Sequence, residues 1–150
     1  MLKGLKEFVA TFAYVGHLPG APGTCGSVAA LSAYVAAGSP SEAYGWAALA
    51  GLVVVGSWAA SGARELFGAE DPRPVVIDEV AGMWLALLVA GAAAWLGLVA
   101  AFVLFRLLDI AKPFPIGRLE RIGGWAGIMA DDLAAGLLAG LVVRLAATMF

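Results

Sequence analysis

The sequence has very few of the residues that many metal and nucleophile sites require. Among its 150 residues, Cys25 is the single cysteine and His17 the single histidine. One cysteine excludes an intrachain disulfide and a cysteine-based zinc site, and no Ser-His-Asp arrangement is evident. Cys25 is not followed by an arginine six positions later, and a lone histidine cannot act as both nucleophile and acid. Mechanisms that depend on a cysteine nucleophile or on a pair of histidines are therefore disfavoured.

Charge is also scarce. Charged residues make up 13% of the chain and hydrophobic residues 62%, and the mean hydropathy is +0.92, well above ordinary soluble usage. Residues 43–63 and 80–105 are uncharged runs, each long enough for a membrane-spanning helix of about 20 residues. No basic tract suggests nucleic acid. The composition indicates a membrane protein; the alternative, a compact soluble helical protein, would need more polar helix faces than the sequence offers.

The pattern predicts an all-α, membrane-embedded bundle of about five to six helices in a single domain, residues 1–150. The first helix is expected to lie on the membrane surface with its lysines toward the headgroups. Proline in the stretch GAEDPRP ends the third helix. The first helix is expected over residues 2–14, and the second from an N-cap at Thr24 or Ser27 to about residue 37. The third is expected to end at about residue 67. The final helix is expected to run from Asp131 or Asp132 to near the C-terminus.

The uncharged run over residues 80–105 is either a single span or two shorter helices joined near Gly91. A break there places eight of the nine basic residues on one side of the membrane, which satisfies the positive-inside rule. A single span would separate the basic loops. We therefore expect a hairpin of two helices of about 13 residues, which are short enough to be re-entrant or buried.

Two acidic pairs head strips of small residues. Asp78, next to Glu79, is followed at four-residue intervals by Gly82, Ala86 and Ala90. The pair Asp131 and Asp132 is followed by Gly136 and Gly140 at the same interval from Asp132. Small residues let helix backbones approach closely, so the two acidic ends are able to meet. The structural alternative is that the acids only cap helix N-termini, where the helix dipole favours them.

A third charged segment, FRLLDIAKPFP, places Arg106, Asp109 and Lys112 on one helix face. Alone, this ladder could be an exposed charge stripe. If its aspartate joins the two acidic pairs, however, five carboxylates repel one another, and a hard divalent cation relieves that repulsion. Oxygen ligands favour Mg²⁺ over zinc. Arg106 and Lys112 are then suited to hold a phosphate, which suggests phosphoryl chemistry by metal-activated water.

The stretch PGAPGTCGS, residues 19–27, is a further candidate anion site. Backbone N–H groups at a helix start bind anions, and Thr24 and Ser27 add hydroxyl groups. The stretch lacks the Gly-Lys-Ser/Thr ending of a P-loop, so nucleotide binding is not indicated. An ordinary turn with a Thr or Ser cap is the alternative. His17, just before it, is either a proton-transfer group or a polar residue at the interface.

Four blocks of sequence together resemble the phosphatidylglycerophosphatase A family. They are PGAPGTCGS (residues 19–27), DPRPVVIDEVAGMWLAL (71–87), FVLFRLLDIAKPFPI (102–116) and GGWAGIMADDLAAG (123–136). Each block is weak on its own, but the four in this order cover most of the chain. The resemblance implies a Mg²⁺-dependent enzyme that hydrolyses the terminal phosphate monoester of phosphatidylglycerophosphate to phosphatidylglycerol and phosphate.

The resemblance also implies a location and a set of roles. We expect a multi-pass protein of the bacterial cytoplasmic (inner) membrane with its active site on the cytoplasmic side, the phospholipid and the bilayer as partners, and no protein partner. From the residues themselves, and not from the resemblance, Arg106, Thr24, Ser27 and His17 are expected to contact the substrate. The residues implied in catalysis are Asp78, Glu79, Asp109, Lys112, Asp131 and Asp132, of which Asp78, Glu79, Asp109 and Asp132 are the expected metal ligands.

Several points stay open in the sequence. Asp131 is either a ligand or a partner of the ligands, and either one or two metal ions are possible. Water attacks directly, or an aspartate is phosphorylated in the cycle. A cation-coupled transporter or channel would use the same carboxylates as an ion path, and a purely structural membrane protein would tolerate their loss.

Overall fold

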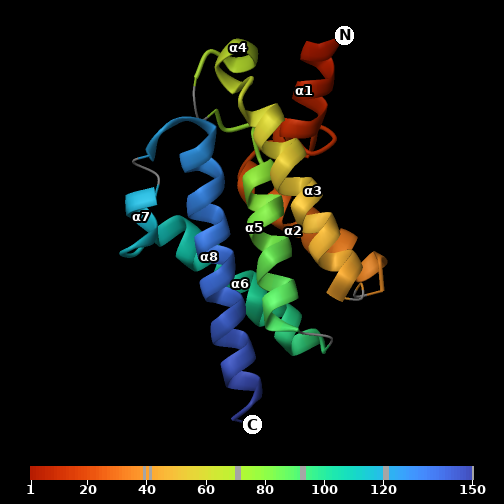
Figure 1. Cartoon of the computed structure of the whole chain (residues 1–150), viewed down its shortest axis with the longest axis vertical. Helices are drawn as coiled ribbons and strands as arrows, with labels where there is room; N and C mark the ends of the chain where they lie inside the picture. Colours follow the sequence, from red (N-terminus) through yellow and green to blue (C-terminus); the bar gives the residue numbers. More distant parts are fainter. Residues whose placement is uncertain (39, 41, 70–71, 92–93, 120–121, 150) are drawn as a thin grey trace.

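The computed structural model describes residues 1–38, 40, 42–69, 72–91, 94–119 and 122–149, and within these ranges all regular structure is helical. Asp71 and Arg121, which belong to the expected blocks and loops, lie outside the described residues. The elements are α1 (Leu2–Ala10), the 3₁₀ turn η1 (Val15–His17), α2 (Pro22–Ala36), α3 (Glu42–Ala60), α4 (Ala63–Phe67), α5 (Ile77–Ala90), α6 (Trp95–Ala111), α7 (Ile116–Leu119) and α8 (Gly124–Ala147) (Figure 1).

The all-helical prediction is confirmed, but several helix boundaries differ from those expected. The eight α-helices of the described ranges exceed the expected five to six. The third helix is interrupted at Gly62, which separates α3 from α4, and the single turn α7 was not expected. The predicted N-cap at Thr24 or Ser27 is wrong, because Pro22 begins α2 and Ala21 precedes it. Proline suits this first position because its missing N–H has no helical partner there.

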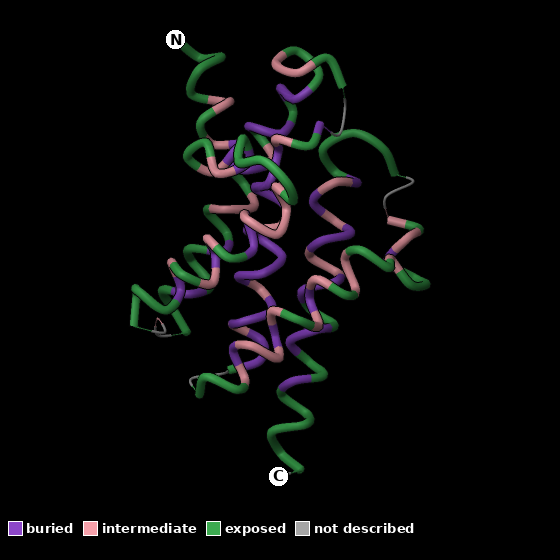
Figure 2. Tube along the Cα trace, turned by 180° about the vertical axis from the view of Figure 1, so that it is seen from behind, coloured by how far each residue is buried: buried purple, intermediate pink, exposed green. Residues whose placement is uncertain are grey.

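Helix α5 forms the centre of the structure, and α2, α3, α6 and α8 pack around it. All its residues except Glu79, Leu85 and Leu88 are buried, and Figure 2 shows buried residues concentrated along this central segment. The indole Nε1 of Trp84 donates a hydrogen bond to the carbonyl of Gly45 in α3, at 3.1 Å. The Trp84 ring also meets Tyr34 of α2 edge to face. A single side chain of α5 thus ties two neighbouring helices to it.

The expected break near Gly91 is confirmed. Helix α5 ends at Ala90, and Gly91 follows with a left-handed φ of 59°, which glycine adopts without strain. Helix α6 begins at Trp95, so the long uncharged run is divided between two shorter helices. The chain therefore returns toward the end from which α5 started, and Figure 1 places the C-terminus at the opposite end of the molecule from the N-terminus.

Glycines bring α5 and α8 into backbone contact, as the strips of small residues predict. A Cβ on Gly136 would lie 2.1 Å from the carbonyl oxygen of Gly82, and one on Gly140 would lie 2.7 Å from that of Ala86. In return, a Cβ on Gly82 would lie 2.6 Å from the carbonyl oxygen of Asp132. No larger residue fits at these positions. The glycine contacts therefore set the distance between α5 and α8 directly beside the second acidic pair.

A left-handed turn after α1 holds the segment that leads into α5. The first helix ends at Ala10 rather than Tyr14, because Phe12, Ala13 and Tyr14 all have positive φ. The chain then packs against the segment before α5: a Cβ on Gly16 would lie 1.9 Å from the carbonyl oxygen of Pro74. The N–H of Val76 also donates to the carbonyl of Ala10. Both contacts fix residues 72–76, which precede the first acidic pair.

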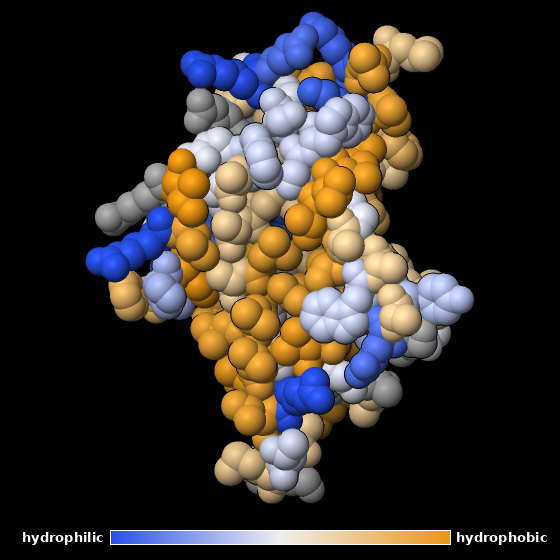
Figure 3. All heavy atoms as spheres, viewed as in Figure 1, coloured by the Kyte–Doolittle hydropathy of each residue, from blue (hydrophilic) through white to orange (hydrophobic). Residues whose placement is uncertain are grey.

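Two helices, Glu42–Ala60 and Gly124–Ala147, are long and apolar enough to cross a bilayer. Figure 3 shows hydrophobic residues over much of one face, with hydrophilic residues mainly at its edges. Exposed apolar side chains follow α8 beyond the acidic pair, among them Leu137, Leu141 and Leu145. Such a row is costly in water and favourable against lipid tails.

The contact between α5 and α8 predicts the effect of adding one methyl group. Gly136→Ala forces the two backbones apart, and overpacking of this kind costs about 1–3 kcal/mol of stability. We expect a lower midpoint in thermal or denaturant unfolding of the detergent-solubilised protein. Gly51→Ala in α3 is the matched control, because no atom lies within 4 Å of the added Cβ. Equal stability of the two variants would contradict this account of the packing.

Candidate metal and phosphate site

The first acidic pair lies in the first turn of α5, facing the start of α2. Asp78 is 7% exposed, and Glu79 is partly buried. A Cβ on Gly23 would lie 2.0 Å from Oε1 of Glu79 and 3.3 Å from Nη1 of Arg106. The absence of a side chain at Gly23 therefore makes the space in which the Glu79 carboxylate lies.

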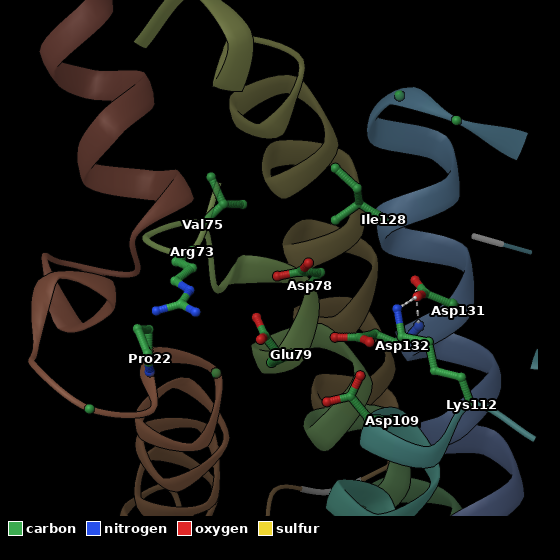
Figure 4. A pocket seen from close by; sticks show the side chains of 14 residues that line it. Pro22, Arg73, Val75, Asp78, Glu79, Asp109, Lys112, Ile128, Asp131 and Asp132 are labelled. Carbon is green, nitrogen blue, oxygen red and sulfur yellow. Dashed lines mark hydrogen bonds and ion pairs between the residues drawn. The ribbon is translucent and has the colours of Figure 1, made fainter. Parts of the chain in front are cut away.

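The second acidic pair lies within α8, because this helix begins at Gly124, well before Asp131. The prediction that α8 starts at Asp131 or Asp132 is wrong, and neither aspartate caps the helix. Asp132 lies beside the first acidic pair of α5, whereas Asp131 pairs with Lys112 at the end of α6. One carboxylate oxygen each from Asp78, Glu79 and Asp132 lies within 4.8 Å of the others (Figure 4). The expected convergence of the two acidic pairs is therefore present in the structure.

Three oxygens of this cluster have no partner. Among the described residues, Oδ1 of Asp78, Oε2 of Glu79 and Oδ2 of Asp132 are buried without a hydrogen bond. A buried acceptor without a donor is destabilising, and a buried unpaired charge more so. Since one oxygen of each of these three carboxylates also lies within 4.8 Å of the others, the group suits a divalent cation, which takes carboxylate oxygens as ligands. The residues present thus fit a metal ion.

The electrostatics of the first turn of α5 support this view. Burial raises the pKa of Asp78 well above its ordinary value, and the charges of Glu79 and Asp132 raise it further. Burial also raises the pKa of Glu79; Asp109 adds to that rise and Arg106 opposes it. The ionised forms of these acids therefore repel one another, and a bound cation would oppose both shifts by favouring the ionised forms.

Asp109 reaches the cluster from the end of α6. Its Oδ2 accepts a hydrogen bond from Nη1 of Arg106 at 2.5 Å, and both side chains are largely buried. The same Nη1 lies 3.4 Å from the hydroxyl oxygen of Ser27. Ser27 is fully buried and donates its own hydrogen to the carbonyl of Gly23. Arg106 thus connects α6 to α2.

Lys112 and Asp131 form a second ion pair beside the cluster. Lys112 ends α6 in a left-handed conformation, and its Nζ lies 2.6 Å from Oδ2 of Asp131. Oδ1 of Asp131 accepts the backbone N–H of Asp132 at 3.1 Å. Both oxygens of Asp131 are therefore engaged, whereas Oδ2 of Asp132 is buried without a hydrogen bond among the described residues. Asp131 is better placed to hold Lys112 than to bind a metal directly.

The acidic cluster lies in a cavity of about 410 Å³. Thr24, Ser27, Arg106 and His17, the expected substrate contacts, do not line it. Lys112 does line it, and the backbone near the start of α2 contributes Gly20, Pro22 and Gly23. The expected acids that line the cavity are Asp78, Glu79, Asp109, Asp131 and Asp132.

His17 lies in η1, away from this cavity. Its Nε2 is 3.2 Å from Oε1 of Glu7 in α1, and its ring is near those of Tyr14 and Phe67. These contacts join the first helix to the end of α4. They match the reading of His17 as a polar residue in a structural position.

Arg73 is the one cavity residue of chemical interest that the sequence interpretation did not select. It lies in the segment before α5 and lines the cavity together with Val75. The sequence feature that could have identified it is its position between two prolines, five residues before Asp78. Proline at both sides restricts the backbone of that segment, which holds the side chain near the acids.

Comparison with known proteins identifies the family. The family model described as Phosphatidylglycerophosphatase A matches residues 8–147, nearly the whole chain. The chain belongs to the phosphatidylglycerophosphatase A family. It is 35% identical to "Phosphatidylglycerophosphatase A" of Escherichia coli over 125 residues, which cover 82% of this chain and 72% of that protein. The resemblance inferred from the four blocks is therefore confirmed.

Other relatives extend the comparison. A protein of Bacteroides thetaiotaomicron named "Putative phosphatidylinositol-3-phosphatase" is 37% identical over 138 residues, covering 87% of this chain and 86% of that protein. "Phosphatidylglycerophosphatase A" of Haemophilus influenzae is 40% identical over 77 residues, 51% of this chain and 47% of that protein. No solved structure gives a significant match.

Membership of the phosphatidylglycerophosphatase A family indicates the activity of this chain. The family and its named members support phosphatidylglycerophosphatase activity, and with it a phospholipid substrate, for this chain. Family membership and the two long apolar helices together indicate a membrane protein. The buried acidic cluster is consistent with a divalent cation.

The contact between Gly23 and Glu79 predicts a loss of activity without loss of the fold. In Gly23→Ala, the Glu79 carboxylate must move away from the added methyl group. This flexible side chain can move at little cost in stability, so we expect at least a tenfold loss of phosphatase activity with a nearly unchanged unfolding midpoint. Gly4→Ala, which meets no atom within 4 Å, is the control. Full activity of Gly23→Ala would show that the Glu79 position is unimportant.

Proposed function

We propose that the chain is a Mg²⁺-dependent phosphatase that removes the terminal phosphate monoester of phosphatidylglycerophosphate at the cytoplasmic face of the bacterial inner membrane. The observation that carries this proposal is the cluster of three buried carboxylate oxygens, unpartnered among the described residues, in a family of lipid phosphatases. Phosphatidylglycerol and phosphate are the products.

Asp78, Glu79 and Asp132 would hold the cation. Asp109, an expected ligand, lines the same cavity but is not among the three carboxylates that lie within 4.8 Å of one another. Mg²⁺ favours oxygen ligands and commonly shares them between one or two carboxylates, water and substrate phosphate. When bound, it neutralises negative charge on the phosphoryl group and lowers the pKa of bound water. Its octahedral preference and the all-oxygen donor set favour Mg²⁺ over zinc.

Two ion pairs beside the acidic cluster, Arg106 with Asp109 and Lys112 with Asp131, hold their side chains in place. Asp131 fixes Lys112 at the edge of the cavity, where the ammonium can donate to a phosphate oxygen. Arg106 holds Asp109 from behind, through the short hydrogen bond to Oδ2. Arg106 therefore acts in our proposal as a positioning residue, rather than as the direct phosphate contact that the sequence suggested.

Asp109 is our candidate for the general base. Its Oδ2 is engaged by Arg106, and it lines the cavity. The carboxylate would accept a proton as a water oxygen attacks phosphorus, while the bond between phosphorus and the glycerol oxygen breaks and that oxygen takes a proton from solvent water. Lys112 would stabilise charge that develops on the phosphoryl oxygens.

The membrane arrangement follows from helix lengths and charge. Helices α3 and α8 would cross the bilayer, whereas α5 and α6, shorter and joined near Gly91, would enter and return. The basic residues before Arg144 then lie on the cytoplasmic side. This multi-pass arrangement places the cavity at the level of the lipid headgroups, where its substrate presents phosphate.

Phosphate release from defined lipids tests the proposal. Purified protein in detergent is given phosphatidylglycerophosphate with Mg²⁺, with chelator, and with Mg²⁺ restored. We expect release only when Mg²⁺ is present, and a loss of at least a hundredfold in kcat for Asp109→Asn. Phosphatidylinositol 3-phosphate serves as a second substrate, because one relative carries that activity in its name.

Two results would overturn the proposal. Release that continues at full rate in chelator would exclude the metal-dependent reaction, and an unaffected Asp109→Asn would exclude the base. The transporter alternative makes a different prediction, namely cation flux into sealed vesicles that depends on Asp78 and Asp132. Flux without phosphate release would favour that alternative.

A further inference from the structure

Arg73 stands apart from the other basic residues near the acidic cluster. Arg106 is engaged by Asp109, and Lys112 by Asp131. For Arg73, the described part of the chain offers no hydrogen-bond or ion-pair partner, although its side chain lines the cavity. Figure 4 shows its guanidinium on the same side of the cavity as Pro22 and Glu79, whereas Lys112 lies on the opposite side beside Asp131.

The segment that carries Arg73 is held rigidly. Pro72 and Val75 on either side are buried, and Pro74 is in contact with Gly16 of η1. The N–H of Val76 donates to the carbonyl of Ala10. These contacts fix the backbone at Arg73, so the guanidinium is kept near the cavity although the residue itself is exposed. An exposed side chain on a fixed backbone loses less entropy on binding than one on a free loop.

We propose that Arg73 is a substrate-binding residue whose guanidinium binds a phosphate group of the lipid. This inference rests on the proposed function. A guanidinium presents a planar fork of donors that matches two oxygens of one phosphate. Because Arg73 and Lys112 lie on opposite sides of the acidic cluster, they would bring cationic donors to the substrate from two directions. The phosphate bound by Arg73 is either the monoester that is released or the diester that links the two glycerols.

The test compares Arg73→Ala and Arg73→Lys with the wild-type protein. Arg118→Ala is the control, because Arg118 is an exposed arginine that stacks on Phe114 and does not line the cavity. Two readouts are measured: binding of inorganic phosphate by titration calorimetry, with no turnover, and steady-state kinetics in mixed micelles. The substrates are phosphatidylglycerophosphate, which has both phosphates, and phosphatidic acid, which has only a monoester.

We expect Arg73→Ala to lower kcat/KM about ten- to a hundredfold, mainly through KM, as for loss of a hydrogen bond between charged groups. Arg73→Lys recovers part of that loss because it keeps the charge but not the fork, and Arg118→Ala behaves as wild type. A loss with both substrates, together with weaker binding of inorganic phosphate, assigns Arg73 to the released phosphate. A loss confined to phosphatidylglycerophosphate assigns it to the diester.

Unchanged kinetics with both substrates in Arg73→Ala would overturn the inference. The outcome is separable from that of the proposed function. If the wild-type protein releases no phosphate from either lipid, the proposed function fails, and the calorimetry alone then decides the role of Arg73. In that case, equal phosphate binding by the wild type and Arg73→Ala, or none in either, overturns the inference.

Discussion

Repulsion among buried carboxylates is the constraint on which the rest of the structure depends. Asp78 and Asp132 are each less than a tenth exposed, and Glu79 lies between the first turn of α2 and α6. Such charges are unfavourable in a protein interior without compensation. The glycine contact between α5 and α8 holds them together regardless, so the free energy of helix packing opposes the repulsion. A cation would relieve this repulsion, because the three carboxylates are already close enough to bind it together.

The surrounding ion pairs divide the charged residues into two groups. Arg106 with Asp109 and Lys112 with Asp131 are held by short contacts, whereas each carboxylate of the central cluster has one buried oxygen without a donor among the described residues. This division explains why a chain with so few charges places them together. In a membrane, paired charges at the level of the headgroups are tolerated, and the apolar surface beyond them meets lipid.

The sequence predicted the elements whose pattern is local. The small-residue intervals after Asp78 and Asp132 identified the α5–α8 contact, and the charge distribution identified the break near Gly91. Boundaries set by tertiary contacts were missed: α8 extends back to Gly124, and α1 stops at Ala10 because of a left-handed turn. The positions of His17 and Arg73 depend on how η1 packs on the segment before α5, and no periodic pattern in the sequence predicts that contact.

The central claim is that carboxylates from α5 and α8 hold one cation between them. Anomalous diffraction from crystals grown with Mn²⁺ in place of Mg²⁺ tests it most directly, because the ion is located independently of the protein. The account predicts an anomalous peak in contact with Asp78, Glu79 and Asp132. A well-ordered cluster with no peak, or a peak bound elsewhere on the protein, would contradict it.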